Sequence, residues 1–184
     1  MRDIVVVDYG AGNTRSVRAA IRRLGATSTL SADPATVLDA EQVILPGVGS
    51  AREAMVHLRA TGASEALRAR FDAGRPTLGI CLGLQLALEF SDEDGGVETL
   101  SLVPGSVRRL QEGRIPRLGW AAVDPNVGTF YFAHSFACDS PMTVATSEGL
   151  AAIVVSHAFT GVQFHPEKSG PVGERWLATC LSLD

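Results

Sequence analysis

Short apolar runs and longer amphipathic segments alternate along the first half of the chain. The apolar runs lie at residues 3–9, 26–30, 42–45 and 75–80. Segments in which apolar residues recur with helical spacing lie at residues 14–24, 51–60 and 64–73, and another begins after Cys81. Strands buried on both faces read as continuous apolar runs and are joined by helices, so this alternation predicts βαβ units on a parallel sheet.

Local signals mark where the predicted helices begin and end. Asn13 directly precedes the first helical segment and Gly25 follows it. These residue types are favoured at helix N-caps and just beyond helix ends, so Asn13 is expected to cap the helix with its side chain. Pro171 is expected to open a last helix that runs to residue 181.

The second half of the chain has a different pattern, in which glycine and proline interrupt short apolar runs. These runs lie at residues 106–110, 121–125, 129–137, 142–147, 151–156 and 159–164. They predict strands that extend the sheet in an antiparallel or mixed arrangement, and the segment 91–98, SDEDGGVE, predicts an exposed acidic loop. We therefore expect an α/β fold with an open mixed, mainly parallel sheet flanked by helices, forming one domain over residues 1–184.

Composition narrows the class of protein. The chain is 46% hydrophobic and 20% charged, and its net charge of −4 without a basic run argues against a nucleic-acid partner. No segment approaches the ~20 apolar residues of a membrane span, and the N-terminal apolar run is too short for a signal peptide. Cys81, Cys138 and Cys180 are widely spaced, which favours a reducing cytoplasm over a disulfide framework or a metal site.

Cys81 stands in GICLGLQ, where an apolar run ends and a helical segment begins. The carboxyl ends of parallel strands bind ligands, and the positive end of a helix favours a thiolate. A strained strand–turn–helix elbow would expose the sulfur and direct the N–H of Leu82 toward an oxyanion, and Gly79 and Gly83 would leave room for a substrate. Cys81 as a small buried hydrophobe is the alternative, and this stretch by itself leaves both open.

A base for such a cysteine is found in GVQFHPEKSG. Pro166 favours an extended conformation at His165, and residues two apart on an extended chain face the same side. Glu167 can therefore accept a hydrogen bond from Nδ1 of His165 and leave Nε2 free to take the thiol proton. An isolated His-Pro-Glu is also typical of a solvated turn, so the two motifs carry weight only together.

Taken together, GICLGLQ and GVQFHPEKSG resemble the class I glutamine amidotransferases, whose Cys–His–Glu triad falls on Cys81, His165 and Glu167. Further motifs in the same order resemble the glutaminase subunits of imidazole glycerol phosphate synthase: DYGAGN at 8–13, ILPGVG at 44–49, PGSVRRL at 104–110, GW at 119–120 and FYFAHSF at 130–136. Each motif is weak alone, but the series is collinear and spans nearly the whole chain.

The resemblance implies a function in histidine biosynthesis. Such a subunit hydrolyses glutamine to glutamate and ammonia with no cofactor. The ammonia passes to a cyclase subunit, a (β/α)₈ barrel, which makes imidazole glycerol phosphate and an aminoimidazole carboxamide ribonucleotide. The expected partners are therefore glutamine and the cyclase, in a heterodimer.

The resemblance also implies roles for single residues. Val48 N–H would complete the oxyanion hole with Leu82. Glutamine would be bound by Gly49, Gln85, Ser135 and Phe136. The partner interface would include Asn13, Trp120 and Lys168.

Some positions depart from the family pattern. Arg117 stands where a histidine is expected before GW, and Ala121 stands where an asparagine is expected after it. Ser50-Ala51 and Phe136 also differ from the usual residues. The resemblance places the GW segment at the docking face, so these departures bear on the partner rather than on the triad.

Three alternatives remain open on the sequence. A glutaminase of another synthase, such as that of pyridoxal phosphate synthesis, would carry GGES-like residues in place of PGVG. A paralogue that feeds a specialised product draws support only from Arg117 and Ala121. A non-catalytic regulatory domain of the same fold is the third alternative, and the intact triad argues against it.

Overall fold

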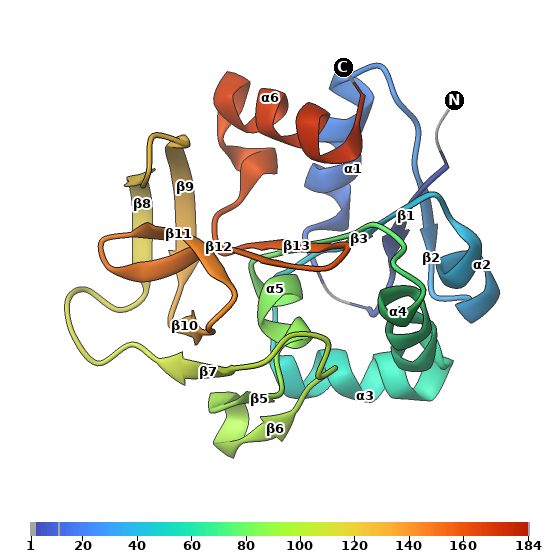
Figure 1. The fold of residues 1–184 in the computed structure, drawn as a ribbon, viewed down its shortest axis with the longest axis horizontal. Helices are drawn as coiled ribbons and strands as arrows, with labels where there is room; N and C mark the ends of the chain where they lie inside the picture. Colours follow the sequence, from blue (N-terminus) through green and yellow to red (C-terminus); the bar gives the residue numbers. More distant parts are fainter. Residues whose placement is uncertain (1–2, 11, 184) are drawn as a thin grey trace.

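The computed structural model describes residues 3–10 and 12–183, so Ala11 of the DYGAGN motif lies outside the described residues. Its centre is a seven-stranded sheet, seen edge-on in Figure 1. In sheet order the strands are β11 (Thr143–Ser147), β12 (Leu150–Ser156), β13 (Phe159–Val162), β4 (Thr77–Ile80), β3 (Gln42–Leu45), β1 (Ile4–Val7) and β2 (Thr29–Ser31).

The pairing of these strands confirms the expected mixed, mainly parallel sheet. From β2 to β13 every neighbouring pair is parallel. The pairs β13–β12 and β12–β11 are antiparallel. The carboxyl ends of β3 and β4 lie side by side, because Leu45 is in register with Gly79, and this edge carries the predicted site.

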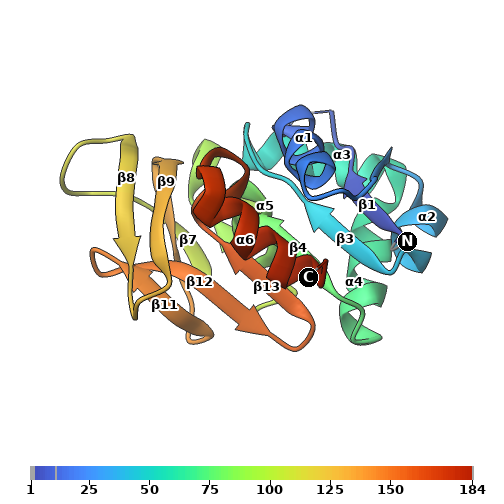
Figure 2. The same ribbon diagram turned by 90° about the horizontal axis from the view of Figure 1, so that it is seen from above.

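Helices cover both faces of the sheet (Figures 1 and 2). One face carries α1 (Thr14–Arg23) and α6 (Gly170–Leu181). The other carries α2 (Pro34–Asp39), α3 (Ala51–Thr61), α4 (Ala63–Asp72) and α5 (Leu82–Ala87). The predicted helices are confirmed to within a residue or two. No helix in the described part of the chain is long and apolar enough to cross a membrane.

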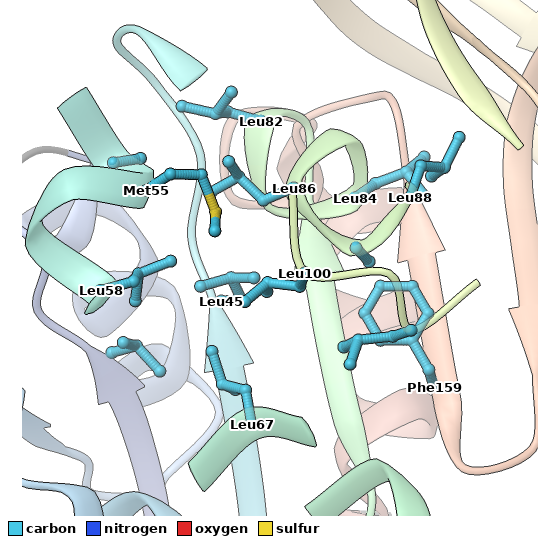
Figure 3. Close-up of a cluster of buried hydrophobic side chains, with 14 of the residues drawn as sticks. Leu45, Met55, Leu58, Leu67, Leu82, Leu84, Leu86, Leu88, Leu100 and Phe159 are labelled. Carbon is cyan, nitrogen blue, oxygen red and sulfur yellow. The ribbon is translucent and has the colours of Figure 1, made fainter. Parts of the chain in front are cut away.

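Strand β1 shows why the sheet needs cover on both sides. All of its residues are buried, and they alternate between two apolar cores. Val5 and Val7 belong to the core beneath α3, α4 and α5, whereas Ile4 and Val6 belong to the core beneath α1 and α6. Figure 3 shows the first of these cores. Burying one such side chain contributes about 1.5–3 kcal/mol, so neither face could be left exposed to water.

Helix α2 was not predicted, although its start carries a clear signal. Asp33 accepts a hydrogen bond from Thr36 N at 2.8 Å, and Pro34 occupies the first turn. Carbonyl groups at the end of α2 accept hydrogen bonds from a side chain on another helix. The fully buried Arg70 of α4 donates to the carbonyl oxygens of Val37 and Ala40 at 3.0 and 2.7 Å. A six-residue helix with one apolar anchor gives too weak a period to recognise in the sequence.

The second half of the chain corrects part of the prediction, because only β11, β12 and β13 extend the central sheet. Two smaller sheets hold the other strands. One contains β10 (Phe136–Asp139), β7 (Ser106–Arg109), β5 (Phe90–Ser91) and β6 (Val97–Glu98), and the other contains β8 (Arg117–Val123) and β9 (Gly128–His134). Exposed and half-buried positions alternate along most of β8, a pattern that suits a sheet with one wet face rather than one covered on both.

The acidic segment 91–98 is exposed at many of its positions, as expected, but it is not a loop throughout. It forms a 3₁₀ turn, η1 (Glu93–Gly95), between β5 and β6, and this turn contacts the start of α3. Glu93 accepts a hydrogen bond from Ala51 N at 2.9 Å, and Asp94 accepts one from the Ser50 hydroxyl. The orphan N–H groups and the positive end of α3 attract these carboxylates, which explains why Glu93 and Asp94 lie against the start of this helix.

Candidate active site

Cys81 lies on a strained turn between β4 and α5. Its φ is 50° and its ψ is −104°, a conformation that an L-residue adopts at a cost of about 1–3 kcal/mol. The backbone N–H of Cys81 donates to Val162 O at 2.7 Å, so the neighbouring strand β13 holds the turn in place. The sequence prediction of a nucleophile elbow is confirmed in its backbone geometry.

Glycines let the turn after β3 press against this elbow. A Cβ added to Gly47 would lie 2.0 Å from Ile80 O and 2.3 Å from Leu82 N. One added to Gly83 would lie 1.9 Å from Leu45 O. The expectation that Gly79 and Gly83 make room for a substrate is therefore wrong, since the space beside them is filled by the protein's own backbone and side chains.

His165 and Glu167 meet as the sequence predicts. Nδ1 of His165 lies 2.9 Å from Oε1 of Glu167, and both side chains are buried. Burial lowers the pKa of His165, but interactions with Cys81 and Glu167 outweigh it and raise the pKa to about 9. Within the described part of the chain, Nε2 of His165 has no hydrogen-bond partner, which leaves it available for a proton.

The expected capping role of Asn13 is wrong. Asn13 occupies the N-cap position of α1, but its side chain makes no capping hydrogen bond. Nδ2 of Asn13 instead donates to Oε1 of Glu167 at 3.1 Å. The first turn of α1 thus contacts the carboxylate that holds His165.

A cavity of about 330 Å³ opens beside Cys81. It is lined by residues that follow β3 and β4 and by the end of β9. Among them are these predicted site residues: Val48, Gly49, Cys81, Leu82, Gln85, Ser135 and Phe136. A larger cavity of about 480 Å³ lies along segment 110–114, but it lacks every residue of the predicted triad.

The predicted interface residues lie outside this cavity. Trp120 is 58% exposed and packs edge-on against Tyr131, and Lys168 is also exposed. Arg117, one of the departures, is mostly buried. Its guanidinium pairs with Glu148 at 3.0 Å and lies 4.2 Å from the centre of the Phe132 ring. Arg117 is therefore engaged within the protein and ties β8 to the turn between β11 and β12.

Two side chains at the site were missed by the sequence analysis. Glu93 lines the cavity, and burial raises the pKa of its carboxyl. Nothing in the sequence signals this, because Glu93 reaches the cavity through the fold of segment 91–98. Gln163 is fully buried and contacts Cys81. Gln163 stands two residues before His165, and residues two apart on an extended chain face the same side. This spacing could have identified Gln163 from the sequence.

His134 of the FYFAHSF motif also lines the cavity. Its Nδ1 lies 2.8 Å from Phe136 O, so Nδ1 carries the proton. Burial is the main cause that lowers the pKa of His134 to about 4, and the nearby Arg117 and His165 add to it. His134 is therefore neutral near pH 7, whereas His165 is the site histidine that binds a proton readily.

Comparisons with known proteins identify the family and the fold. The family description "Glutamine amidotransferase class-I" matches residues 5–182. A solved structure titled as a glutamine amidotransferase superposes with a TM-score of 0.80 over 97% of both chains, and its 20% identity shows the fold alone. Fold and family together define a class-I glutamine amidotransferase.

Curated relatives place the chain within that class. The subunit HisH of imidazole glycerol phosphate synthase from Carboxydothermus hydrogenoformans is 42% identical, with 94% of this chain and 96% of that protein covered. The subunit of the same name from Chloroflexus aurantiacus is 38% identical, with 95% and 93% covered. The chain therefore belongs to the HisH family of imidazole glycerol phosphate synthase subunits, and it is a glutamine amidotransferase enzyme.

Proposed function

We propose that the chain hydrolyses glutamine at Cys81 and passes the ammonia to a cyclase subunit for the synthesis of imidazole glycerol phosphate. The observation that carries this proposal is the strained elbow at Cys81, which faces a cavity and interacts with His165 of the buried His165–Glu167 pair. A cysteine with only a packing role would not need a left-handed backbone at the mouth of a cavity.

The first half of the reaction forms a thioester. His165 Nε2 takes the proton of the Cys81 thiol, and the sulfur attacks the side-chain amide carbon of glutamine. The new C–S bond moves the carbonyl π electrons onto oxygen. The C–N bond then breaks, and the nitrogen leaves as ammonia with the proton that His165 returns to it. Glu167 fixes the imidazole through Nδ1 and stabilises its protonated form.

The second half regenerates the enzyme. His165 takes a proton from water, and the resulting hydroxide attacks the thioester carbon. The C–S bond breaks, glutamate leaves, and the sulfur takes back its electron pair and then the proton. Every step uses side chains of the chain and one water molecule.

Backbone N–H groups of Val48 and Leu82 are the proposed oxyanion donors. The close approach of Gly47 to Leu82 N, which only a glycine allows, brings the two turns together and supports this assignment. Tyr9 donates to Pro46 O and anchors the turn that carries Val48. One such donor contributes about 10²–10³-fold in rate.

The amino-acid end of glutamine is proposed to lie between Gln85, Ser135 and Phe136, with Gly49 beside it. Glu93 is the one carboxylate among the described lining residues, so it is the natural partner for the α-ammonium group. Nε2 of Gln85 already donates to Phe136 O and to Gln163, which leaves its Oε1 as the acceptor that the substrate can use.

The cyclase barrel is proposed to cover the mouth of this cavity in a cytoplasmic heterodimer, with no nucleic acid or membrane involved. Val48, Leu118 and Trp120 are large apolar side chains exposed by 38%, 54% and 58%, and the first two line the cavity. Apolar side chains around a polar site are typical of a surface that another protein covers. Asn13 and Lys168 are proposed to lie at the rim of this interface.

The glutaminase rate, measured with and without the cyclase subunit of the same organism, tests the function. We expect the wild-type chain to release glutamate at a low rate alone and faster with the cyclase. Only the two subunits together should form imidazole glycerol phosphate from glutamine. Cys81→Ala should abolish glutamate release but leave the pair able to use free ammonia. A wild-type chain that releases glutamate but never supports the cyclase would instead indicate a paralogue serving another synthase.

A further inference from the structure

Gln163, directly after the end of β13, contacts the sulfur of Cys81. The side chain of Gln163 is fully buried, and its Nε2 lies 3.4 Å from Sγ of Cys81. This is an ordinary distance for an N–H donor and a sulfur acceptor. A buried amide with a donor on the proposed nucleophile is a chemical feature that the triad does not use.

A single backbone carbonyl fixes which end of Gln163 faces the sulfur. Phe136 O can only accept, so the group of Gln85 that lies 3.0 Å from it must be the Nε2 donor. The same Nε2 lies 3.1 Å from Gln163, which must therefore present its oxygen. The Nε2 of Gln163 is left to face Cys81.

The chain of hydrogen bonds also holds Gln163 rigidly. Its partners are Gln85 on α5 and Cys81 on the elbow, and Cys138 Sγ on β10 lies 3.9 Å from its oxygen. Rotation of the amide would place two donors against each other at Gln85 and remove the donor from the sulfur. Both changes are costly where water cannot compensate.

We propose that Gln163 is a further catalytic residue, which donates a hydrogen bond to the Cys81 sulfur and stabilises it as a thiolate. The inference rests on the proposed role of Cys81 as nucleophile. The N–H bond of Gln163 stays intact while the thiol proton moves to His165. The donor acts again in the second half of the reaction, when the thioester breaks and the sulfur regains its negative charge.

Gln163→Met tests this proposal, because methionine keeps a similar volume and flexibility but donates no hydrogen bond. The measurement is the rate of iodoacetamide alkylation at Cys81 against pH, followed on the Cys81 peptide by mass spectrometry. Hydrogen bonds to charged groups contribute about 1.5–3 kcal/mol in proteins, which corresponds to a rise of about one to two pH units in the alkylation midpoint. The kcat for glutamine should fall about ten- to a hundredfold at pH 7.

Gln42→Met provides the matched control. Gln42 is also buried, but it lies at the start of β3, at the end of the sheet opposite Cys81. Its alkylation profile should coincide with that of the wild type. Gln163→Leu serves as a second donor-free variant, so that the result does not depend on whether Gln163→Met folds.

The possible results separate the two claims. An unchanged alkylation midpoint in a folded Gln163→Met or Gln163→Leu chain would overturn the role of Gln163 and leave the role of Cys81 intact. A wild-type chain in which a glutamine-analogue electrophile fails to label Cys81 would overturn the proposed function itself. A raised midpoint in both Gln163 variants, with Gln42→Met unaffected, is the result that we expect.

Discussion

Hydrogen bonds from other parts of the chain hold the His165–Glu167 pair in place. Oε1 of Glu167 accepts two hydrogen bonds, from Nδ1 of His165 at 2.9 Å and from Nδ2 of Asn13 at 3.1 Å. His165 is fixed a second time, because its backbone N–H donates to Tyr131 O at 2.8 Å on β9. The imidazole therefore has little freedom to turn away from the sulfur, which is what a proton carrier requires.

Asn13 gives a prediction at this scale. Asn13→Ala should lower kcat for glutamine about tenfold, because Glu167 loses a hydrogen bond to its charged form and holds His165 less firmly. Asn13→Asp should lower it further through repulsion between carboxylates. Steady-state kinetics of the isolated chain measure both, with Thr14→Ala as the neighbouring control.

The isolated chain also separates two roles for Asn13. If Asn13 acts only at the interface with the cyclase, its variants would match the wild type in the absence of the partner. Loss of rate without the partner is the result that the contact with Glu167 predicts.

The sequence predicted the triad and several residues that line the cavity, but not the hydrogen bonds that join distant parts of the chain around Cys81. Cys81, His165 and Glu167 stand in local motifs, and the contact between His165 and Glu167 spans two residues of extended chain. Gln163 and Gln85 are 78 positions apart, and their contact depends on how β13 pairs with β4. Periodicity and spacing describe neighbours along the chain, so contacts between distant segments lie beyond them.

At the scale of the elements, the site depends on two turns at the carboxyl edge of the sheet. The turn after β3 and the elbow after β4 approach so closely that a Cβ on Gly83 would lie 1.9 Å from Leu45 O. That distance is far below any tolerable contact, so the neighbouring backbone would have to move. The proposed oxyanion donors at Val48 and Leu82 sit on these two turns, which makes their spacing sensitive to a single methyl group.

Gly83→Ala is therefore expected to damage both stability and catalysis. Overpacking of this kind destabilises by about 1–3 kcal/mol or more, and urea unfolding measures the change. Gly25→Ala is the control, because Gly25 has a positive φ of 77° but no atom within 4 Å of an added Cβ. Gly25→Ala should lower the free energy of unfolding by about 1 kcal/mol through backbone strain alone and leave the glutaminase rate unchanged. Equal stability of the two variants would contradict the close packing of the turns.

Most of the helices and the central parallel strands were predictable because each is buried in a regular way. Strands β1, β3 and β4 are buried at every position, and amphipathic segments separate them in the sequence. The assignment of the later strands to sheets was not predictable. Strands β7, β8, β9 and β10 pair across loops, and which partners they choose is decided by tertiary packing rather than by a local period.

At the scale of the whole molecule, two parts of the central sheet have different roles. The carboxyl edge carries Cys81 and the cavity, and the strands at the β11 side support the β8–β9 hairpin through Arg117 and Glu148. The hairpin presents Leu118 and Trp120 beside the cavity, where the cyclase is proposed to dock. That residues 1–184 form one domain stays a prediction.

Covalent labelling with a glutamine-analogue diazo-ketone tests the proposed role of Cys81 most directly. The chain has three free cysteines, of which Cys81 alone stands on a strained turn beside the cavity. We predict one equivalent of label, on Cys81 only, with loss of glutaminase activity in proportion and protection by glutamine. Label on Cys138 or Cys180 with activity lost, or full activity in Cys81→Ala, would contradict the assignment of Cys81 as the nucleophile.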